Sequence, residues 1–157
     1  MYITSFLDDL TSCNIFGPLL GLVYTIKFQK HGLPHMHLLL MLSPTFRLKT
    51  PEQVDMLIQV TWPDPHLEPS LFDVVKRCMV HGPCGQLNKN TPCMKEGRCS
   101  KGFPKAFQSE TVMSKNGYPI YAHPDDGRVF DVGDFALDNR WIVPYNPFLL
   151  SWEAFLS

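Results

Sequence analysis

Two histidines, His35 and His37, stand two residues apart at the start of the apolar run 35–42. Alternate side chains of a β-strand point to the same face, so both imidazoles would lie side by side while Met36 points to the opposite layer. Neutral imidazoles suit Mn, Zn and similar ions, and an ion held by two histidines keeps open positions for a phosphate oxygen or water. The spacing therefore predicts a metal-binding site formed by two histidines on one strand. The alternative is two solvated histidines on an exposed strand face.

A second group of potential ligands lies in the middle of the chain. His81 and Cys84 are separated by two residues, and Cys93 and Cys99 follow between turn-rich spacers. Three thiolates and one imidazole make a closed tetrahedral zinc site of the structural kind. Cys78 is a competing fourth ligand, although on a helix it would be a small buried hydrophobe. We predict a structural zinc at His81, Cys84, Cys93 and Cys99, because free thiols would leave about fifty residues rich in Pro and Gly without a core.

Basic side chains surround these predicted zinc ligands and make this segment the best candidate for a phosphate-contacting surface. We assign DNA binding to Arg98, Lys101 and Lys105, with Lys89 and Lys95 as neighbours. A scatter of solvated charges is the alternative. The chain has 14 Lys and Arg against 15 Asp and Glu, a net charge of −1, so any attraction of nucleic acid must be local.

Composition also predicts the setting of the protein. No apolar run reaches the roughly 18 residues of a membrane span, and no basic-then-apolar signal pattern follows Met1. Five cysteines, four of them between positions 78 and 99, suit a metal site in a reducing compartment better than a disulfide framework. We therefore expect an intracellular protein with no membrane partner.

The elements that position these residues predict an α+β fold. Residues 3–10 have helical spacing, and residues 19–29 and 35–42 predict an antiparallel hairpin at the buried centre of a sheet. We expect the His-x-His strand to be central in that sheet, with helices packed on one face. In such a hairpin Lys27 or Gln29 would face the histidines. A lysine would repel a divalent ion, which leaves Gln29 as a possible oxygen ligand.

The rest of the chain is less regular. Thr50, Pro51 and Gln53 predict an N-cap, a first helical position and a capping box for a helix to about residue 60. A second helix is expected from Ser70, a strand at 140–143 and the start of a helix at 148–155. From 81 to 133 there is no long periodic element, which predicts an irregular insert held by zinc.

Several separate motifs carry a family resemblance. Residues 15–42, IFGPLLGLVYTIKFQKHGLPHMHLLLML, closely resemble the HUH-motif segment of Helitron transposase proteins of the rolling-circle Rep type. The resemblance continues, in the order of the family, through 79–85, 93–94, 99–105, 117–121 and 137–147. It implies an HUH single-stranded DNA endonuclease core, with Mg or Mn at His35 and His37, single-stranded DNA as partner and a nuclear location. The division it suggests is 1–80 for the HUH-type sheet and helices, 81–133 for the zinc insert and 134–157 for a return strand and the start of a helical segment.

The same resemblance implies what this sequence lacks. The family typically has Glu at the position of Lys27, and its tyrosine nucleophile lies on a Tyr-rich helix that follows the stretch matching 146–150. The present sequence stops before that helix, and it contains no helicase phosphate loop. None of its five tyrosines is expected on a Tyr-rich helix: Tyr2, Tyr24, Tyr118, Tyr121 and Tyr145. We therefore assign no catalytic residue. We expect a fragment of a Helitron protein that is inactive alone as a tyrosine endonuclease and strand transferase. The alternative is a non-catalytic zinc- and DNA-binding module or a degenerate transposon relic.

Overall fold

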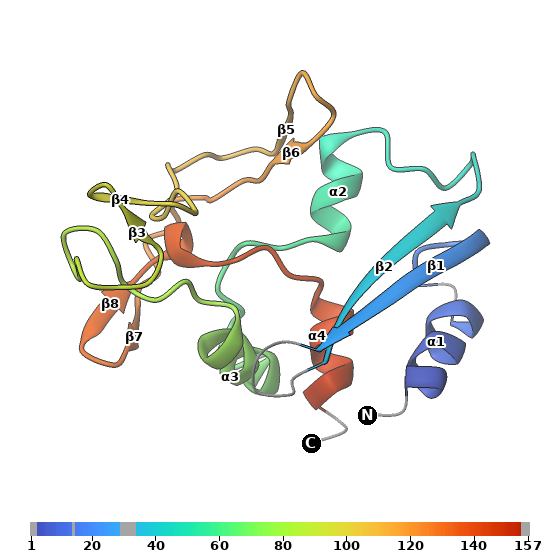
Figure 1. Ribbon diagram of the computed structural model, residues 1–157, viewed down its shortest axis with the longest axis horizontal. Helices are drawn as coiled ribbons and strands as arrows, with labels where there is room; N and C mark the ends of the chain where they lie inside the picture. The colour runs from blue at the N-terminus through green and yellow to red at the C-terminus, as the bar shows by residue number, and fades with distance from the viewer. Residues whose placement is uncertain (1–2, 14, 29–33, 155–157) are drawn as a thin grey trace. The chain divides into compact units, whose positions relative to one another are not determined.

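The computed structural model describes residues 3–13, 15–28 and 34–154 of the 157-residue chain (Figure 1). The chain divides into two compact units, 1–49 and 50–157. Both helices and small antiparallel sheets are present, so the fold class is α+β as predicted. In the residues that the structure describes, no helix has both the length and the apolar character needed to cross a membrane.

The first unit contains helix α1 (Ile3–Ser12) and a hairpin of strands β1 (Leu19–Phe28) and β2 (Pro34–Leu42). The predicted helix and antiparallel hairpin are both present. Among the described residues β2 pairs with β1 alone, so a central place for it in a larger sheet is not shown. The described side chains of both strands are half-buried or exposed, and the expected burial of the hairpin is not met. A two-stranded sheet leaves much of its surface open because no further strand covers its edges.

The described part of the second unit, residues 50–154, holds three helices, a 3₁₀ turn and three short hairpins. The helices are α2 (Pro51–Leu57), α3 (Pro69–Cys78) and α4 (Pro147–Ala154), and α3 packs against α4. The hairpins pair β3 (Met94–Lys95) with β4 (Arg98–Cys99), β5 (Val112–Met113) with β6 (Pro119–Ile120), and β7 (Phe130–Val132) with β8 (Phe135–Leu137). Figure 1 shows β3–β4 and β7–β8 at one side of this unit and β5–β6 extending away from them.

Helix α2 begins as the sequence predicts. The side chain of Thr50 accepts a hydrogen bond from the backbone N–H of Gln53, and the side chain of Gln53 accepts one from the backbone N–H of Thr50. This reciprocal pair satisfies two N–H groups that the first helical turn leaves free. The helix ends at Leu57, before the predicted residue 60, because Gln59 instead pairs with Tyr145 in an antiparallel bridge.

The predicted strand at 140–143 is not formed. Asp138 instead accepts a hydrogen bond from the backbone N–H of Arg140 at 2.9 Å and caps the 3₁₀ turn η1 (Asn139–Trp141). Within 140–143, an isolated bridge between Ile142 and Val80 is the only strand pairing of the described residues. The bridge between Ile142 and Val80 sets the backbone around residue 142 beside the chain that leaves α3. It therefore also fixes the position of His81, the residue after Val80.

The core of the second unit combines residues from before, within and after the predicted insert. Trp62 is 1% exposed and lies 5.6 Å from Phe72 and 5.1 Å from Phe130 between ring centroids. Burying rings of this size contributes much of the free energy of folding. The buried members of the cluster are Val60, Trp62, Leu71, Val75, Cys84, Leu137, Trp141, Ile142 and Tyr145.

Candidate metal centre and its cationic surroundings

The four predicted zinc ligands are brought together by two backbone arrangements. His81 follows α3, and its backbone N–H donates to the carbonyl oxygen of Trp141 at 2.8 Å. Cys93 directly precedes β3 and Cys99 ends β4, so the short hairpin presents both thiols. Its two-residue turn has positive φ at Glu96 (50°) and Gly97 (78°), the backbone that tight hairpin turns require.

The distances suit a tetrahedral metal ion. The Nε2 atom of His81 lies 3.6 Å from the Sγ atom of Cys84 and 3.5 Å from that of Cys99. Zinc bonds of about 2.1 Å to nitrogen and 2.3 Å to sulfur, at tetrahedral angles, separate the two ligand atoms by about 3.6 Å. All four ligand atoms, including the Sγ atom of Cys93, lie within 4.8 Å of one another. The group can therefore hold a metal ion such as zinc.

The surroundings of the ligands affect their protonation. Burial, and then the positive charges of Lys105 and Lys101, lower the pKa of His81, which favours the neutral imidazole that a metal requires. Burial raises the pKa of Cys84 to about 12, and the neighbouring thiols Cys99 and Cys93 add to this. A bound cation would supply the opposite charge that a buried thiolate needs.

Cys99 has the opposite shift. Burial acts to raise its pKa, but hydrogen bonds from the backbone N–H groups of Phe103 and Lys101 and from the neighbouring thiols together lower it to about 7. Cys78, the alternative fourth ligand, lies at the last residue of α3, is exposed and is outside the group. The prediction that it is a buried hydrophobe is wrong, because α3 ends at this residue and the side chain is exposed.

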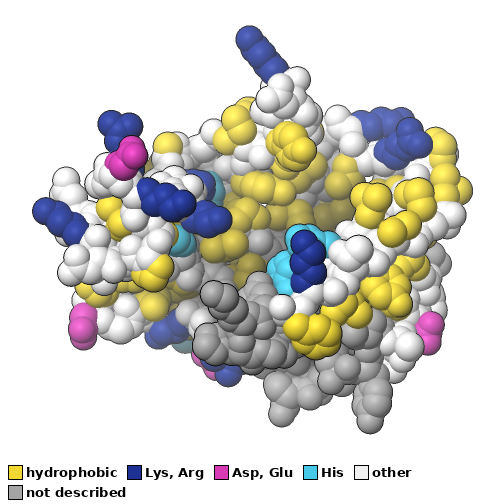
Figure 2. Space-filling model, viewed as in Figure 1, with side chains coloured by type: hydrophobic (Ala, Val, Ile, Leu, Met, Phe, Trp, Pro, Cys, Tyr) yellow, Lys and Arg dark blue, Asp and Glu magenta, His cyan; other side chains and the backbone are white. Residues whose placement is uncertain are grey.

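The three cationic residues assigned to DNA lie on the segment 98–105 beside these ligands. Arg98 and Lys101 are exposed, and Lys105 is half-buried. The Nζ atom of Lys105 donates to the carbonyl oxygen of Lys101 at 2.7 Å and lies 4.6 Å from the ring centroid of Phe103. That ring stacks on His81, with centroids 4.2 Å apart and planes at 15°. Figure 2 shows Lys and Arg side chains gathered over the part of the molecule that holds β3 and β4, next to histidine and apolar surface.

The histidine pair lies in the first unit. His35 and His37 are exposed on β2, and their ring centroids are 4.6 Å apart, so they share one face as predicted. Lys27 is the cross-strand partner of His35 and Thr25 that of His37. Partners directly opposite in an antiparallel pair share a face, so Lys27 faces the histidines. Gln29, the predicted oxygen ligand, lies outside the described residues. Within the described part of the chain, no group of three or more His, Cys, Asp or Glu residues includes this pair.

The described tyrosines do not have the setting of a nucleophile. Tyr24 lies in β1, Tyr118 and Tyr121 flank β6, and Tyr145 precedes α4, so none of these four is on a helix. Tyr145 is 3% exposed and its hydroxyl donates to the carbonyl oxygen of Thr61 at 3.0 Å. Burial, and then the negative charge of Glu68, raise the pKa of Tyr145, the opposite of what an attacking phenolate needs. Tyr2 lies outside the described residues.

Sequence reasoning did not identify His123 and Asn139, which are both buried and linked. The Nδ1 atom of His123 lies 2.8 Å from the carbonyl oxygen of Asn139. The side chain of Asn139 accepts a hydrogen bond from the backbone N–H of Trp62 and donates one to the carbonyl oxygen of Pro124, both at 2.9 Å. No spacing rule marks such residues, because their partners are far away along the chain.

Comparison with known families supports a relationship over the first part of the chain. Residues 1–40 match the family model described as the Helitron helicase-like domain at N-terminus. The matched segment includes β1 and both histidines of the pair on β2. A search among curated proteins found no match.

Proposed function

We propose that this chain is a zinc-stabilised module of a Helitron-type rolling-circle protein that binds single-stranded DNA. The observation that carries the proposal is the group His81, Cys84, Cys93 and Cys99, whose ligand atoms lie within 4.8 Å of one another, with Nε2 of His81 at 3.6 and 3.5 Å from the Sγ atoms of Cys84 and Cys99. All four positions belong to protein side chains, so the site is of the closed, structural kind and holds no open position for catalysis.

The cations beside this group support DNA as the partner. Arg98 directly precedes Cys99, Lys101 lies two residues after Cys99, and Lys105 lies four residues after Lys101. A metal that holds the hairpin would therefore also hold these charges in place. The similarity of residues 1–40 to the Helitron helicase-like domain supports a Helitron-related protein that acts on DNA. We propose the nucleus as the place where it acts.

We further propose that His35 and His37 hold a divalent ion, Mg or Mn, only weakly. Their adjacent rings supply two nitrogen ligands, and two ligands leave room for phosphate oxygens in the HUH nuclease manner. The ammonium group of Lys27 on the same face repels such an ion. We therefore propose a DNA-binding module in preference to an active endonuclease.

Two measurements on the purified chain test the main proposal. Elemental analysis is expected to find about one zinc per chain, and fluorescence anisotropy with a labelled single strand is expected to show binding that weakens with salt. Lys101→Ala and Lys105→Ala should each reduce the slope of log affinity against log salt by about 0.7, the value for one phosphate contact on a single strand. The matched control is Lys76→Ala, an exposed lysine on α3 that should leave the slope unchanged. Folded protein without zinc, or zinc-loaded protein that does not bind the strand, would contradict the proposal.

A further inference from the structure

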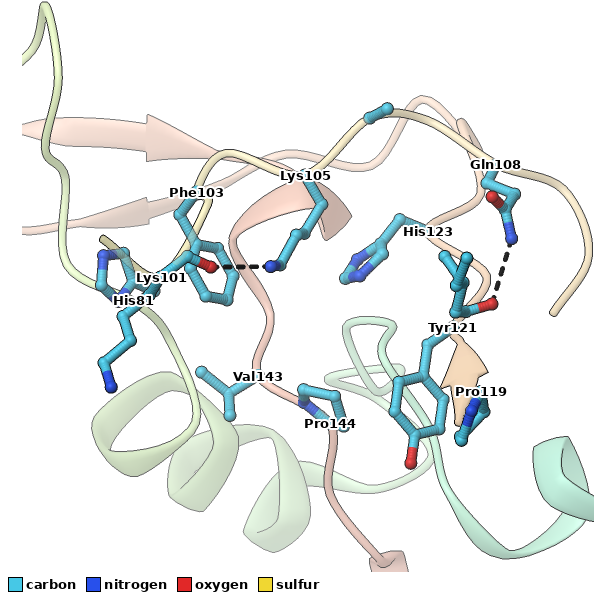
Figure 3. Close-up of a pocket in the computed structure, with 12 residues that line it drawn as sticks. His81, Lys101, Phe103, Lys105, Gln108, Pro119, Tyr121, His123, Val143 and Pro144 are labelled. Atoms are coloured by element: carbon cyan, nitrogen blue, oxygen red, sulfur yellow. Dashed lines mark hydrogen bonds between the residues drawn. The ribbon is translucent and has the colours of Figure 1, made fainter. Parts of the chain in front are cut away.

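A pocket of about 710 Å³ opens beside the metal centre, within the second unit. A volume of this size is typical of sites for small organic ligands. Its walls are mainly apolar, with the ring of Phe103 at one side and Pro144 and Tyr121 at the other (Figure 3). The ring of Phe103 already stacks on His81 and has the ammonium group of Lys105 over it, so Tyr121 and Pro144 are the flat groups left to contact a planar aromatic ligand.

One buried polar side chain lines this pocket. His123 is 5% exposed, and Figure 3 shows its ring between Lys105 and Tyr121. Because a carbonyl oxygen only accepts hydrogen bonds, the bond to Asn139 requires the proton on Nδ1. Burial, as the largest effect, lowers the pKa of His123 and favours the neutral ring. Its Nε2 atom is then a hydrogen-bond acceptor, and among the described residues the side chain of His123 makes only the hydrogen bond through Nδ1.

Two cations stand at the same pocket. Lys101 is exposed, and Lys105 is half-buried with its ammonium group donating to the carbonyl oxygen of Lys101 at 2.7 Å; both lysines line the pocket. No carboxylate is among the residues that line it. The pocket therefore combines mainly apolar walls, one buried acceptor and two lysines. A nucleotide has the complementary parts, since each base has a flat face and N–H donors and is joined to a phosphate.

We propose that this pocket takes one base of a bound DNA single strand, with Nε2 of His123 accepting a hydrogen bond from a base N–H while Lys101 and Lys105 face the adjoining phosphate. This inference rests on the proposed function, because it names where on the module the strand is held. It adds a contact to a base, which the charges alone do not supply. A strand bound only through its phosphates would place no base in this pocket.

The test compares two labelled probes of equal length and charge. One is a 12-mer of thymidine, and the other is a 12-mer of the sugar-phosphate backbone without bases. The zinc-loaded full chain is expected to bind the thymidine strand about 5- to 100-fold more tightly, as base stacking on aromatic side chains typically gives. Equal affinity for the two probes would overturn the inference and leave the proposed function standing. Binding of neither probe would overturn the proposed function itself.

Substitutions of residues that line the pocket test whether the base binds there. His123→Asn keeps a side-chain N–H near the Nδ1 position and removes the Nε2 acceptor, and it should reduce the preference for the thymidine strand several-fold. Tyr121→Leu removes a half-buried ring from the wall and should reduce the preference even if the histidine variant does not fold. Lys76→Ala is the control and should keep the full preference. Zinc content and circular dichroism establish folding, and a full preference in either folded pocket variant would place the base elsewhere and overturn the inference.

Discussion

Replacing Asn139 by alanine tests how the second unit is held together. Asn139 is 1% exposed, and its side chain makes two hydrogen bonds of 2.9 Å, one from the backbone N–H of Trp62 and one to the carbonyl oxygen of Pro124. Alanine would leave both backbone groups without these partners. Each buried group left unpaired costs about 1 to 3 kcal/mol, so the free energy of unfolding should fall by about 2 to 6 kcal/mol.

Urea denaturation followed by tryptophan fluorescence measures this loss, because Trp62 and Trp141 are both buried in the core of this unit. The control is Asn90→Ala, an exposed asparagine for which a change within about 0.5 kcal/mol is expected. The free energies should be compared at equal zinc content, since bound metal adds its own stabilisation. A loss below about 1 kcal/mol for Asn139→Ala would show that its two hydrogen bonds do not secure the links to Trp62 and Pro124.

Three further predictions concern charge and chemistry. Lys27→Glu should strengthen Mn binding to the histidine pair at least tenfold in calorimetric titration, because it replaces a facing cation by a carboxylate; equal affinity would show that the ion does not bind there. Burial opposes ionisation of Asp138, but hydrogen bonds from Arg140 outweigh it and lower the pKa of Asp138. The ionised carboxylate therefore stabilises the folded state above the usual pKa of 3.8, and this stabilisation is lost as pH falls through the lower pKa of the folded state. Asp138→Asn should therefore flatten the acid limb of the stability profile, and an unchanged limb would assign the acid loss to other groups. Incubation with a labelled single strand and Mn should give no covalent adduct on a denaturing gel, since none of the described tyrosines is on a helix; a band that His35→Ala abolishes would refute this.

Several features follow from short-range sequence signals. Thr50 and Gln53 predict their own reciprocal hydrogen bonds because the two residues are three positions apart, within one helical turn. The alternation of β-strands places His35 and His37 on one face wherever that strand lies. The ligand types of the metal group were also readable, because few arrangements other than a metal site explain His81, Cys84, Cys93 and Cys99 in a segment so poor in periodic structure.

Other features depended on contacts between distant segments. Residues 140–143 have the composition of a strand, yet Asp138 caps a 3₁₀ turn there, and Ile142 meets Val80 only in an isolated bridge. Cys78 fits the ligand set by spacing, but the end of α3 leaves it exposed and outside the group.

The pocket is the clearest case of what only the tertiary structure decided. Phe103, His123 and Pro144 lie at scattered positions in the sequence and line one cavity because the chain returns to itself through the bridges at Gln108 and Ile142. The sequence by itself determined which residues could bind a metal and which local elements could form, since both depend on residue types a few positions apart. It could not determine which side chains share a cavity, because burial and hydrogen-bond partners depend on long-range packing of the whole unit.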